Sequence, residues 1–321
     1  MLWRKKICVI GGGRWGKNHI RTLSGLDSLA AIAEVSSARL DELIKQYPNV
    51  IGYTSIDDAI AARYDGYTIA TPAETHYEIA KKIIAQGLNL LIEKPMTMTS
   101  DESVELVAMA EKTGSRLMVG HVLLFHPAII KIKEIVDSGK LGKLFYLYST
   151  RLNLGTVRTG ESVFSSFAPH DISVLDYIIG KPATMIEAKG SRFLQENIFD
   201  STMTQLSYPD NIHAHIYVSW LHPFKEQRLV LVGSQGMISF DDSSKEKDIY
   251  FYNKRVDFEN GQPVKIEKPE EIIPYEKKMP LEEELKYFIG HLNTTIEVAD
   301  GKSGYEVVKM LEQVKQIIES K

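Results

Sequence analysis

The sequence predicts an α/β domain with a doubly wound parallel sheet, followed by an α+β domain with a large open, mostly antiparallel sheet. Up to about residue 122, short apolar runs alternate with segments of helical periodicity, which is typical of parallel strands joined by helices. A glycine-rich turn separates the first run from the first helical segment. Beyond residue 122, strand-like segments follow one another with few helices, which favours antiparallel pairing. We therefore expect domains at 1–122 and 123–321.

The first domain opens with an apolar strand that runs directly into the glycines. Strands are expected over residues 5–10, 29–33, 66–70, 88–92 and 116–119, and helices over 38–47, 54–62, 75–86 and 99–114. Gly87 is a typical stop signal for the helix over 75–86. Thr99 and Glu102 have the spacing of a capping box, which opens a helix that ends near Gly114. Ligands of such sheets bind beyond the carboxyl ends of the strands. The side chains at those ends should therefore line one cleft: Gly11, Glu34, Thr71, Lys94 and His121.

The second domain is expected to be built mainly of strands. They are predicted over residues 143–153, 184–194, 201–208, 212–221, 227–232, 237–240 and 248–252. Helices are expected over residues 127–136 and 170–179, and two more, over 281–292 and 305–318, close the chain. Residues 233–236 resemble a hairpin turn, and 241–248 a solvated loop.

Composition excludes several classes of partner. Of 321 residues, 44% are hydrophobic and 25% charged, as in ordinary globular proteins. A net charge of −4 argues against nucleic acid or an anionic membrane as the main partner. The single cysteine, Cys8, cannot form an internal disulfide, which suits a reducing cytoplasm. No apolar run is long enough for a signal peptide or a membrane span, so we expect a cytoplasmic protein.

The turn Gly11–Gly16 has the spacing of a dinucleotide fingerprint. Gly11 would make the tight turn, Gly13 would let the backbone approach a pyrophosphate, and Gly16 would allow close packing of helix and strand. The following helix offers free N–H groups to the phosphates. Arg14 and Trp15 lie within the same turn and are expected to contact the cofactor.

Glu34 indicates which dinucleotide binds. It lies about twenty residues beyond the last fingerprint glycine, where a carboxylate accepts hydrogen bonds from the adenosine ribose and repels a 2′-phosphate. This favours NAD. The alternative is NADP, because Ser36, Ser37 and Arg39 follow closely and would hold a 2′-phosphate if Glu34 turned away.

Lys94 is the first catalytic candidate. It follows a predicted central strand, within Glu93-Lys94-Pro95. From there an ammonium group can stabilise the alkoxide that develops when a hydroxyl is oxidised. A nearby base must then take the proton. The alternative is a strand-end turn that carries only a surface ion pair.

These motifs together resemble the Gfo/Idh/MocA family. The resemblance rests on the glycine turn, Ala70-Thr71-Pro72, Glu93-Lys94-Pro95 and Ala168-Pro169-His170-Asp171, in that order. It implies an N-terminal Rossmann domain and a C-terminal α+β domain. The open sheet of the second domain would form subunit contacts in a homodimer or homotetramer. Lys94 and His170 would be the catalytic pair, and Thr71, Pro72, His76 and Glu93 would complete the cofactor contacts.

One position departs from the family pattern. Many relatives have an aspartate four residues before the catalytic histidine, where this chain has Ser166. The sequence therefore leaves open what orients His170. Asp171 is adjacent, but adjacency does not imply contact.

Substrate contacts are expected near the domain junction and just beyond it. His121 and His126 flank the junction, where similar enzymes place residues near nicotinamide and substrate. Arg151, Asn153 and Arg158 are candidates for a diphosphate, since arginine can bind phosphate in bidentate fashion; solvated surface is the alternative. His213 and His215 share one face of a predicted strand, but no third ligand is evident, so no metal is expected.

Four segments carry a closer resemblance within the family: residues 120–127, 151–158, 167–173 and 218–234. In these segments the chain resembles the branch of UDP-N-acetylglucosamine 3-dehydrogenases and of enzymes acting on the corresponding uronate. The resemblance implies that NAD oxidises the C3 hydroxyl of a nucleotide sugar, giving a 3-keto sugar for cell-surface amino-sugar biosynthesis. The neutral sugar is favoured because no residue is assigned to a second carboxylate. The alternatives are an inositol or hexose dehydrogenase, an NADP-linked ketoreductase, and a non-catalytic NAD-binding regulator.

Overall fold

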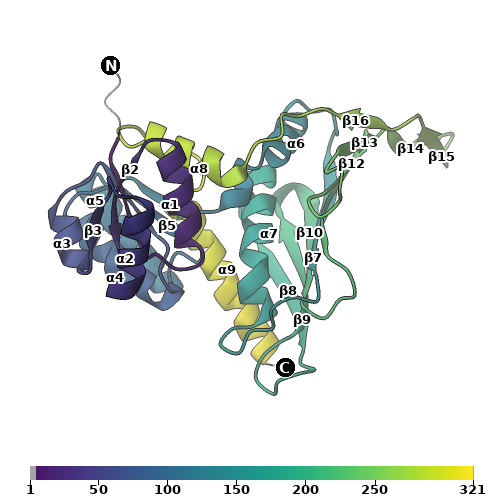
Figure 1. Cartoon of the computed structure of the whole chain (residues 1–321). Coiled ribbons are helices and arrows are strands. Elements are labelled where there is room, and N and C mark those ends of the chain that lie inside the picture. Colours follow the sequence, from purple (N-terminus) through teal and green to yellow (C-terminus); the bar gives the residue numbers. More distant parts are fainter. Residues whose placement is uncertain (1–4, 321) are drawn as a thin grey trace. The chain divides into compact units, whose positions relative to one another are not determined.

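The computed structural model describes residues 5–320, which form two compact units (Figure 1). The first unit comprises residues up to Phe125 together with Lys278–Lys309. The second comprises His126–Lys277 and the end of the last helix. The sequence prediction assigned all of 123–321 to one domain, whereas residues 278–309 pack with the first unit.

The first unit contains a six-stranded parallel sheet. Its strands are β1 (Ile7–Ile10), β2 (Leu29–Ala33), β3 (Ile51–Tyr53), β4 (Gly66–Ile69), β5 (Leu90–Glu93) and β6 (Leu117–Gly120). Their order is β3-β2-β1-β4-β5-β6, so the strand order reverses between β1 and β4. This is the doubly wound order of dinucleotide-binding folds. The sequence prediction missed β3, a three-residue edge strand with two exposed residues.

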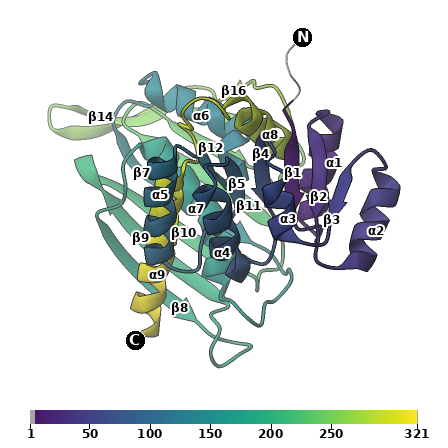
Figure 2. The same cartoon turned by 90° about the vertical axis from the view of Figure 1, so that its left-hand side faces the viewer.

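Helices cover both faces of this sheet. The unit contains α1 (Gly16–Gly25), α2 (Ser37–Gln46), α3 (Ile56–Ala61), α4 (His76–Ala85), α5 (Ser100–Thr113), α8 (Pro280–Gly290) and the first part of α9 (Gly301–Glu319). Helices α3, α4 and α5 lie against one face, in front of the strands in Figure 2. The predicted capping box is confirmed: Thr99 accepts from the Glu102 N–H, and Gly114 ends α5 in the left-handed conformation.

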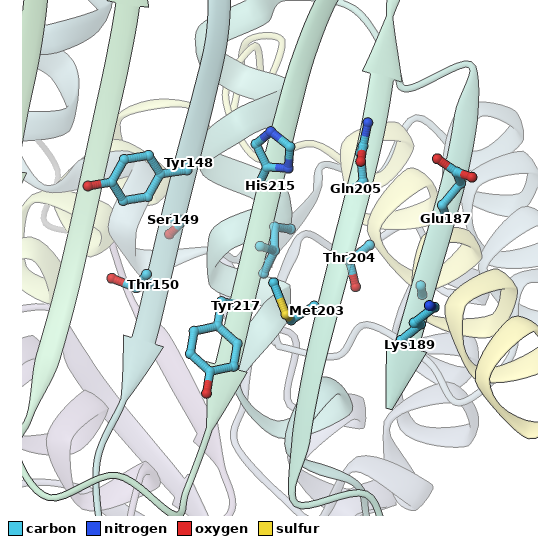
Figure 3. Close-up of a pocket in the computed structure, with 12 residues that line it drawn as sticks. Tyr148, Ser149, Thr150, Glu187, Lys189, Met203, Thr204, Gln205, His215 and Tyr217 are labelled. Carbon is cyan, nitrogen blue, oxygen red and sulfur yellow. The ribbon is translucent and has the colours of Figure 1, made fainter. Parts of the chain in front are cut away.

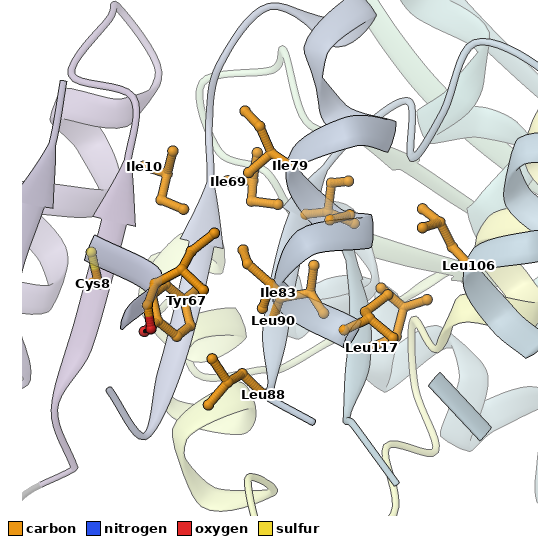
Figure 4. Packing of buried hydrophobic residues seen from close by; sticks show 14 of the residues in the cluster. Cys8, Ile10, Tyr67, Ile69, Ile79, Ile83, Leu88, Leu90, Leu106 and Leu117 are labelled. Atoms are coloured by element: carbon orange, nitrogen blue, oxygen red, sulfur yellow. Dashed lines mark hydrogen bonds between the residues drawn. The ribbon is translucent and has the colours of Figure 1, made fainter. Parts of the chain in front are cut away.

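The main core lies between the sheet and these helices (Figure 4). Ile10, Ile69 and Leu90 of the strands pack against Ile79 and Ile83 of α4. Cys8 belongs to the same cluster, and burial raises the pKa of its thiol to about 12. Cys8 therefore has the buried, unreactive role expected of it.

The second unit is built on an eight-stranded sheet. Its strands are β7 (Leu144–Leu152), β8 (Met185–Ser191), β9 (Ser201–Tyr208), β10 (Ile212–Ser219), β11 (Glu226–Gly233), β12 (Met237–Asp241), β13 (Ile249–Tyr252) and β16 (Glu271–Ile273). The order is β16-β13-β12-β11-β7-β10-β9-β8, and β7 and β10 form its parallel pair. β14 (Lys254–Glu259) and β15 (Gln262–Glu267) form a separate hairpin. In this unit the sequence prediction missed the strands β14, β15 and β16. The predicted fold class, with its mostly antiparallel second sheet, is confirmed.

Two helices complete the second unit. They are α6 (Pro127–Asp137) and α7 (Val163–Ile179), and α7 packs on β7, β9 and β10. Helix α7 was expected to begin at His170, but it begins seven residues earlier, at Val163, and is capped by Ser162. Pro169 obscured this start, because proline ordinarily marks a helix boundary and here lies inside the helix. His170 therefore lies mid-helix.

The face of the sheet opposite α7 is open. Along β9, the residues that face α7 are buried, while Met203 and Gln205 on the other face are exposed. Figure 3 shows two rows of side chains across this face, His215 with Gln205 and Tyr217 with Met203. They line a shallow depression of about 540 Å³. Within residues 5–320, no helix is long and apolar enough to cross a membrane.

Candidate active site

The glycine turn follows β1, next to the end of β4. Gly11 has φ +98°, and a Cβ there would lie 2.8 Å from the Ala70 carbonyl oxygen. A Cβ on Gly16 would lie 1.9 Å from the Gly11 carbonyl oxygen. Both positions therefore require glycine. A Cβ on Gly13 would meet no atom within 4 Å, so the turn leaves space at this position.

The Glu34 carboxylate is directed at this turn. Oε2 accepts the Gly12 N–H at 2.8 Å, and Oε1 accepts the Ser36 N–H at 2.9 Å. Burial opposes ionisation of Glu34, but these bonds and the Arg39 guanidinium outweigh it and hold the pKa below its usual value. The residues fit NAD, because an ionised carboxylate beside the turn can accept ribose hydroxyls.

Two of the three residues considered for a 2′-phosphate, Ser36 and Arg39, make contacts within the protein. Arg39 Nη1 lies 3.1 Å from Glu34 Oε2. The Ser36 hydroxyl caps α2 by accepting the Arg39 N–H. The charges of Glu34 and Arg39 therefore offset each other, so a 2′-phosphate would meet the Arg39 guanidinium together with the Glu34 carboxylate.

Glu93 connects the glycine turn to Lys94. Its Oε1 accepts the indole N–H of Trp15 at 2.5 Å and lies 2.8 Å from Nε2 of His19. Its Oε2 accepts the backbone N–H of Lys94 at 3.3 Å. Glu93 is 8% exposed, whereas Trp15 is 41% exposed. The Glu93 carboxylate thus holds the segments on which Trp15 and Lys94 lie.

His76 positions the neighbouring segments. Its Nδ1 lies 2.8 Å from the Pro95 carbonyl and its Nε2 3.0 Å from the Thr71 carbonyl. Burial lowers the pKa of His76, and the two carbonyls act in the opposite direction. Both ring nitrogens therefore lie within hydrogen-bond distance of the protein's own carbonyls, and the cofactor contact of His76 stays a prediction. Thr71 accepts a hydrogen bond from Thr75, while Pro72 and Arg14 are exposed.

The two junction histidines have different environments. His121 is 1% exposed, and neither ring nitrogen has a hydrogen-bond partner within residues 5–320. Burial lowers the pKa of His121 to about 4, so its imidazole is neutral at pH 7. His126 instead caps α6: its Nδ1 accepts the Ala128 N–H, and its Nε2 lies 3.5 Å from Asp242. His126 therefore has a structural role at the start of α6, and its contact with substrate stays a prediction.

Arg151 is held by a carboxylate of its own unit. Its Nε donates to Asp171 Oδ2 at 3.0 Å and its Nη2 to Oδ1 at 3.2 Å. Ser149 also donates to Oδ1, at 2.5 Å. The Arg151 side chain is 14% exposed. The bidentate pair that was expected with a diphosphate is thus formed with Asp171.

The other diphosphate candidates are less constrained. Arg158 is exposed and lies 3.7 Å from Glu161. Asn153 follows β7, and its Oδ1 is buried without a hydrogen-bond partner in the described chain. The exposed Arg158 is therefore more available to a diphosphate than Arg151, whose guanidinium is paired with Asp171.

His170 lies in the middle of α7 and is half-buried. Ser166, one turn earlier, is buried. The Asp171 carboxylate binds Arg151 and Ser149, so sequence adjacency does not make it the partner of His170. Lys94 belongs to the first unit and His170 to the second.

His213 and His215 lie on the open face of β10. His213 Nδ1 lies 3.3 Å from the Ser207 hydroxyl. Across residues 5–320, no group of three histidine, cysteine or acidic residues could hold a metal ion.

Sequence reasoning missed three residues of the first unit. Gly12 was passed over because the fingerprint names only its neighbours. His19 follows the fingerprint within α1, where no pattern distinguishes it from a core residue. Glu284 of α8 is fully buried and lies among ordinary charged residues in the sequence.

The fold and the strand-end site define a dinucleotide-dependent oxidoreductase. Residues 5–121 match the family model described as an oxidoreductase family with an NAD-binding Rossmann fold, and residues 129–239 match the GFO/IDH/MocA C-terminal domain. The chain belongs to the Gfo/Idh/MocA family. The predicted enzyme class and NAD cofactor are thereby confirmed.

Three relatives are informative. Inositol 2-dehydrogenase from Corynebacterium glutamicum is 28% identical over 191 residues, 57% of each chain. UDP-N-acetylglucosamine 3-dehydrogenase from Acidithiobacillus ferrooxidans is 28% identical over 188 residues, 57% of this chain and 56% of that enzyme. The solved structure of UDP-N-acetylglucosamine 3-dehydrogenase GnnA from the same organism superposes with a TM-score of 0.86, at 22% identity, over 98% of both chains. The matched stretches thus span little more than half of these two sequence relatives, whereas the fold is shared over the whole length.

Proposed function

We propose that the protein oxidises the C3 hydroxyl of UDP-N-acetylglucosamine with NAD, giving a 3-keto sugar for cell-surface amino-sugar biosynthesis. The observation that carries the proposal is the likeness to a UDP-N-acetylglucosamine 3-dehydrogenase over 98% of both chains. The corresponding uronate is the second nucleotide-sugar candidate. The neutral sugar is preferred because no residue is assigned to a second carboxylate.

Bound NAD supplies the hydride acceptor, and the protein supplies the acid–base groups. His170 takes the proton of the C3 hydroxyl, and the Lys94 ammonium stabilises the alkoxide that develops. Gly13 and Glu34 hold the pyrophosphate and the adenosine ribose, respectively. His121, being neutral at pH 7, contributes no positive charge that would compete with Lys94.

A second function is favoured by one observation. Inositol 2-dehydrogenase from Corynebacterium glutamicum is 28% identical to this chain, as is UDP-N-acetylglucosamine 3-dehydrogenase from Acidithiobacillus ferrooxidans, and the matched stretches have similar lengths. The competing candidate is therefore an inositol or hexose dehydrogenase that uses the same Lys94 and His170. A non-catalytic NAD-binding regulator is the alternative from another class, and it would require neither residue.

A substrate panel tests the proposal directly. The purified protein is incubated with NAD and either UDP-N-acetylglucosamine, its uronate, myo-inositol or glucose, and NADH absorbance is followed. A 3-aminotransferase is added to trap the keto product for mass spectrometry. We expect turnover of UDP-N-acetylglucosamine. Turnover of inositol or glucose with inert nucleotide sugars would favour the second candidate, and NADH binding without any turnover would favour the regulator.

Two variants test the catalytic pair. Lys94→Ala should lower kcat by about 10²–10⁴-fold while NADH binding is nearly intact, because Lys94 acts on charge that develops in the transition state. His170→Ala should do the same and also remove the acid limb of the rate profile. Lys112→Ala, on the exposed surface of α5, is the matched control. Wild-type kcat in either variant would remove that residue from the pair.

The proposed assembly is a homodimer or homotetramer formed through the open face of the eight-stranded sheet. Met203 is 65% exposed on this face, and Met185 of the neighbouring strand is 54% exposed. Met203→Glu should lower the mass measured by light scattering, because it places a charge within the contact. Met279→Glu, at a 68% exposed methionine of the first unit, is the control. A monomeric wild-type protein would contradict the proposal.

A further inference from the structure

A cluster of buried ionisable groups surrounds the Glu93 carboxylate in the first unit. His19 of α1 is fully buried and contacts Glu93 Oε1, and Trp15 donates to the same oxygen. A Cβ on Gly120 of the neighbouring strand would lie 2.9 Å from the Glu93 carboxyl carbon. Glu93 is therefore fixed from three sides: by α1, by β6 and by the Lys94 backbone.

Glu284 of α8 is a second buried carboxyl group of the first unit, within reach of the Glu93 charge. It is 0% exposed, and neither of its oxygens has a hydrogen-bond partner within residues 5–320. Helix α8 packs against α1 and against the short segment that follows His121. Glu93 is the charged group that acts on Glu284. An isolated buried carboxylate is costly, and the charge of one carboxylate disfavours ionisation of another carboxyl group that it reaches.

The donors distinguish the two carboxyl groups. Glu93 receives N–H groups from Trp15 and from Lys94, and it lies beside the His19 ring. Glu284 receives none within the described chain. Hydrogen bonds from N–H groups favour the ionised form, and burial without donors favours the neutral form. Burial, followed by the charge of Glu93, raises the pKa of Glu284 well above its usual value.

We propose that Glu284 remains a protonated acid, so that Glu93 is the single carboxylate of the cluster and acts as a positioning residue for Trp15 and Lys94. The charge on Glu93 holds the glycine turn and the lysine segment in one arrangement. Only the catalytic consequence rests on the function proposed for Lys94. The charge assignment concerns the first unit alone and can be tested without any substrate.

The first experiment measures the melting temperature of the wild type and Glu284→Gln between pH 5 and pH 9. An acid whose pKa is raised on folding stabilises the protein fully below its unfolded pKa, and this stabilisation is lost as pH rises toward the folded value. Glutamine imitates the neutral acid and does not titrate. The melting temperature of the variant, relative to that of the wild type, should therefore rise by about 2 °C per pH unit above pH 5. Glu282→Gln, on the exposed side of the same helix, should follow the wild type, and parallel curves for Glu284→Gln would overturn the proposal.

The second experiment reads the positioning by the NMR resonance of the Trp15 indole N–H. A bond to a carboxylate shifts this resonance downfield. Glu93→Gln should move it upfield, whereas Glu284→Gln should leave it in place at pH 7. Trp220 provides an internal reference, because its indole donates to Asp200 Oδ1 at 2.6 Å in the second unit. Equal shifts in both variants, or none in Glu93→Gln, would overturn the proposal whatever substrate the enzyme uses.

Discussion

The Glu34 carboxylate accepts the backbone N–H of Gly12 at 2.8 Å, so the residue proposed to bind the ribose is bonded to the turn proposed to receive the pyrophosphate. Gly12 is closely surrounded, since a Cβ there would lie 2.5 Å from Leu43 Cδ1 and 3.2 Å from Glu34 Oε2. The glycine turn and Glu34, the two parts of the proposed cofactor site, are therefore joined by a hydrogen bond. A change in Glu34 should affect the turn as well as the ribose.

Glu34→Ala should weaken NADH binding by about ten- to a hundredfold and relax discrimination against NADPH. The variant loses a charge-assisted hydrogen bond, worth about 1.5–3 kcal/mol, and releases Arg39 toward a 2′-phosphate. Fluorescence titration with both reduced cofactors measures the change. Glu42→Ala, on the exposed surface of α2, is the control. A wild type that prefers NADPH would refute the assignment of Glu34.

Gly13→Ala and Gly16→Ala should separate cofactor binding from folding. Gly16→Ala places a methyl group 1.9 Å from a carbonyl oxygen, so it should destabilise the first unit by about 3 kcal/mol or more. Gly13→Ala meets no protein atom, so its melting temperature should be close to wild type while NADH binding falls at least about tenfold. Thermal unfolding and NADH titration decide the matter. Tight NADH binding by Gly13→Ala would show that the backbone there does not approach the cofactor.

The buried His121 should make the protein sensitive to acid. Its pKa falls from 6.5 to about 4 on folding because burial disfavours the imidazolium. The unfolded chain therefore binds the proton more readily, and stability is lost as pH falls from 6.5 toward 4. The free energy of unfolding should fall by up to about 3 kcal/mol over this range.

Urea unfolding of the wild type and His121→Gln at pH 7 and pH 4.5 measures this contribution. The variant should lose less stability on acidification, because glutamine does not titrate. The other titrating groups contribute equally to the free energy of unfolding of both proteins, so their effect cancels in the comparison. An equal loss in the two proteins would contradict the assignment of a neutral, buried His121.

Arg151→Ala should destabilise the second unit by about 3–5 kcal/mol, because it leaves the buried Asp171 without its partner. Arg158→Ala should change stability by less than about 0.5 kcal/mol, since Arg158 is exposed and its pair with Glu161 is long. Denaturant unfolding compares them. An Arg151→Ala variant of wild-type stability with a raised KM would restore Arg151 as a diphosphate ligand.

The sequence predicted the features that depend on local pattern. The glycine turn, the capping box at Thr99 and the placement of Lys94 at a strand end all follow from short segments. The partner of Arg151 was not predictable, because Asp171 and Arg151 lie on a helix and a strand that only the tertiary fold brings together. The capping bond of His126 was missed for a related reason: it depends on the exact residue at which α6 begins, which the sequence pattern does not define. Glu284 carries no sequence signal, since its burial results from the return of α8 to the first unit.

That return has a consequence for how the chain is made. Leu292 Cδ2 lies 2.9 Å from the position of a Cβ on Gly66, and the Ala299 carbonyl accepts the Val119 N–H at 2.7 Å. A ribosome synthesises the glycine turn, Glu34 and Lys94 within the first 125 residues, but it reaches Leu292 and Ala299 only after residues 126–277 of the second unit. While the second unit is synthesised, the first 125 residues therefore lack residues 278–309, and the apolar surface that those residues cover in the folded protein stays exposed. A fragment cut after Phe125 would carry all the glycine and lysine motifs but lack the residues that complete its core.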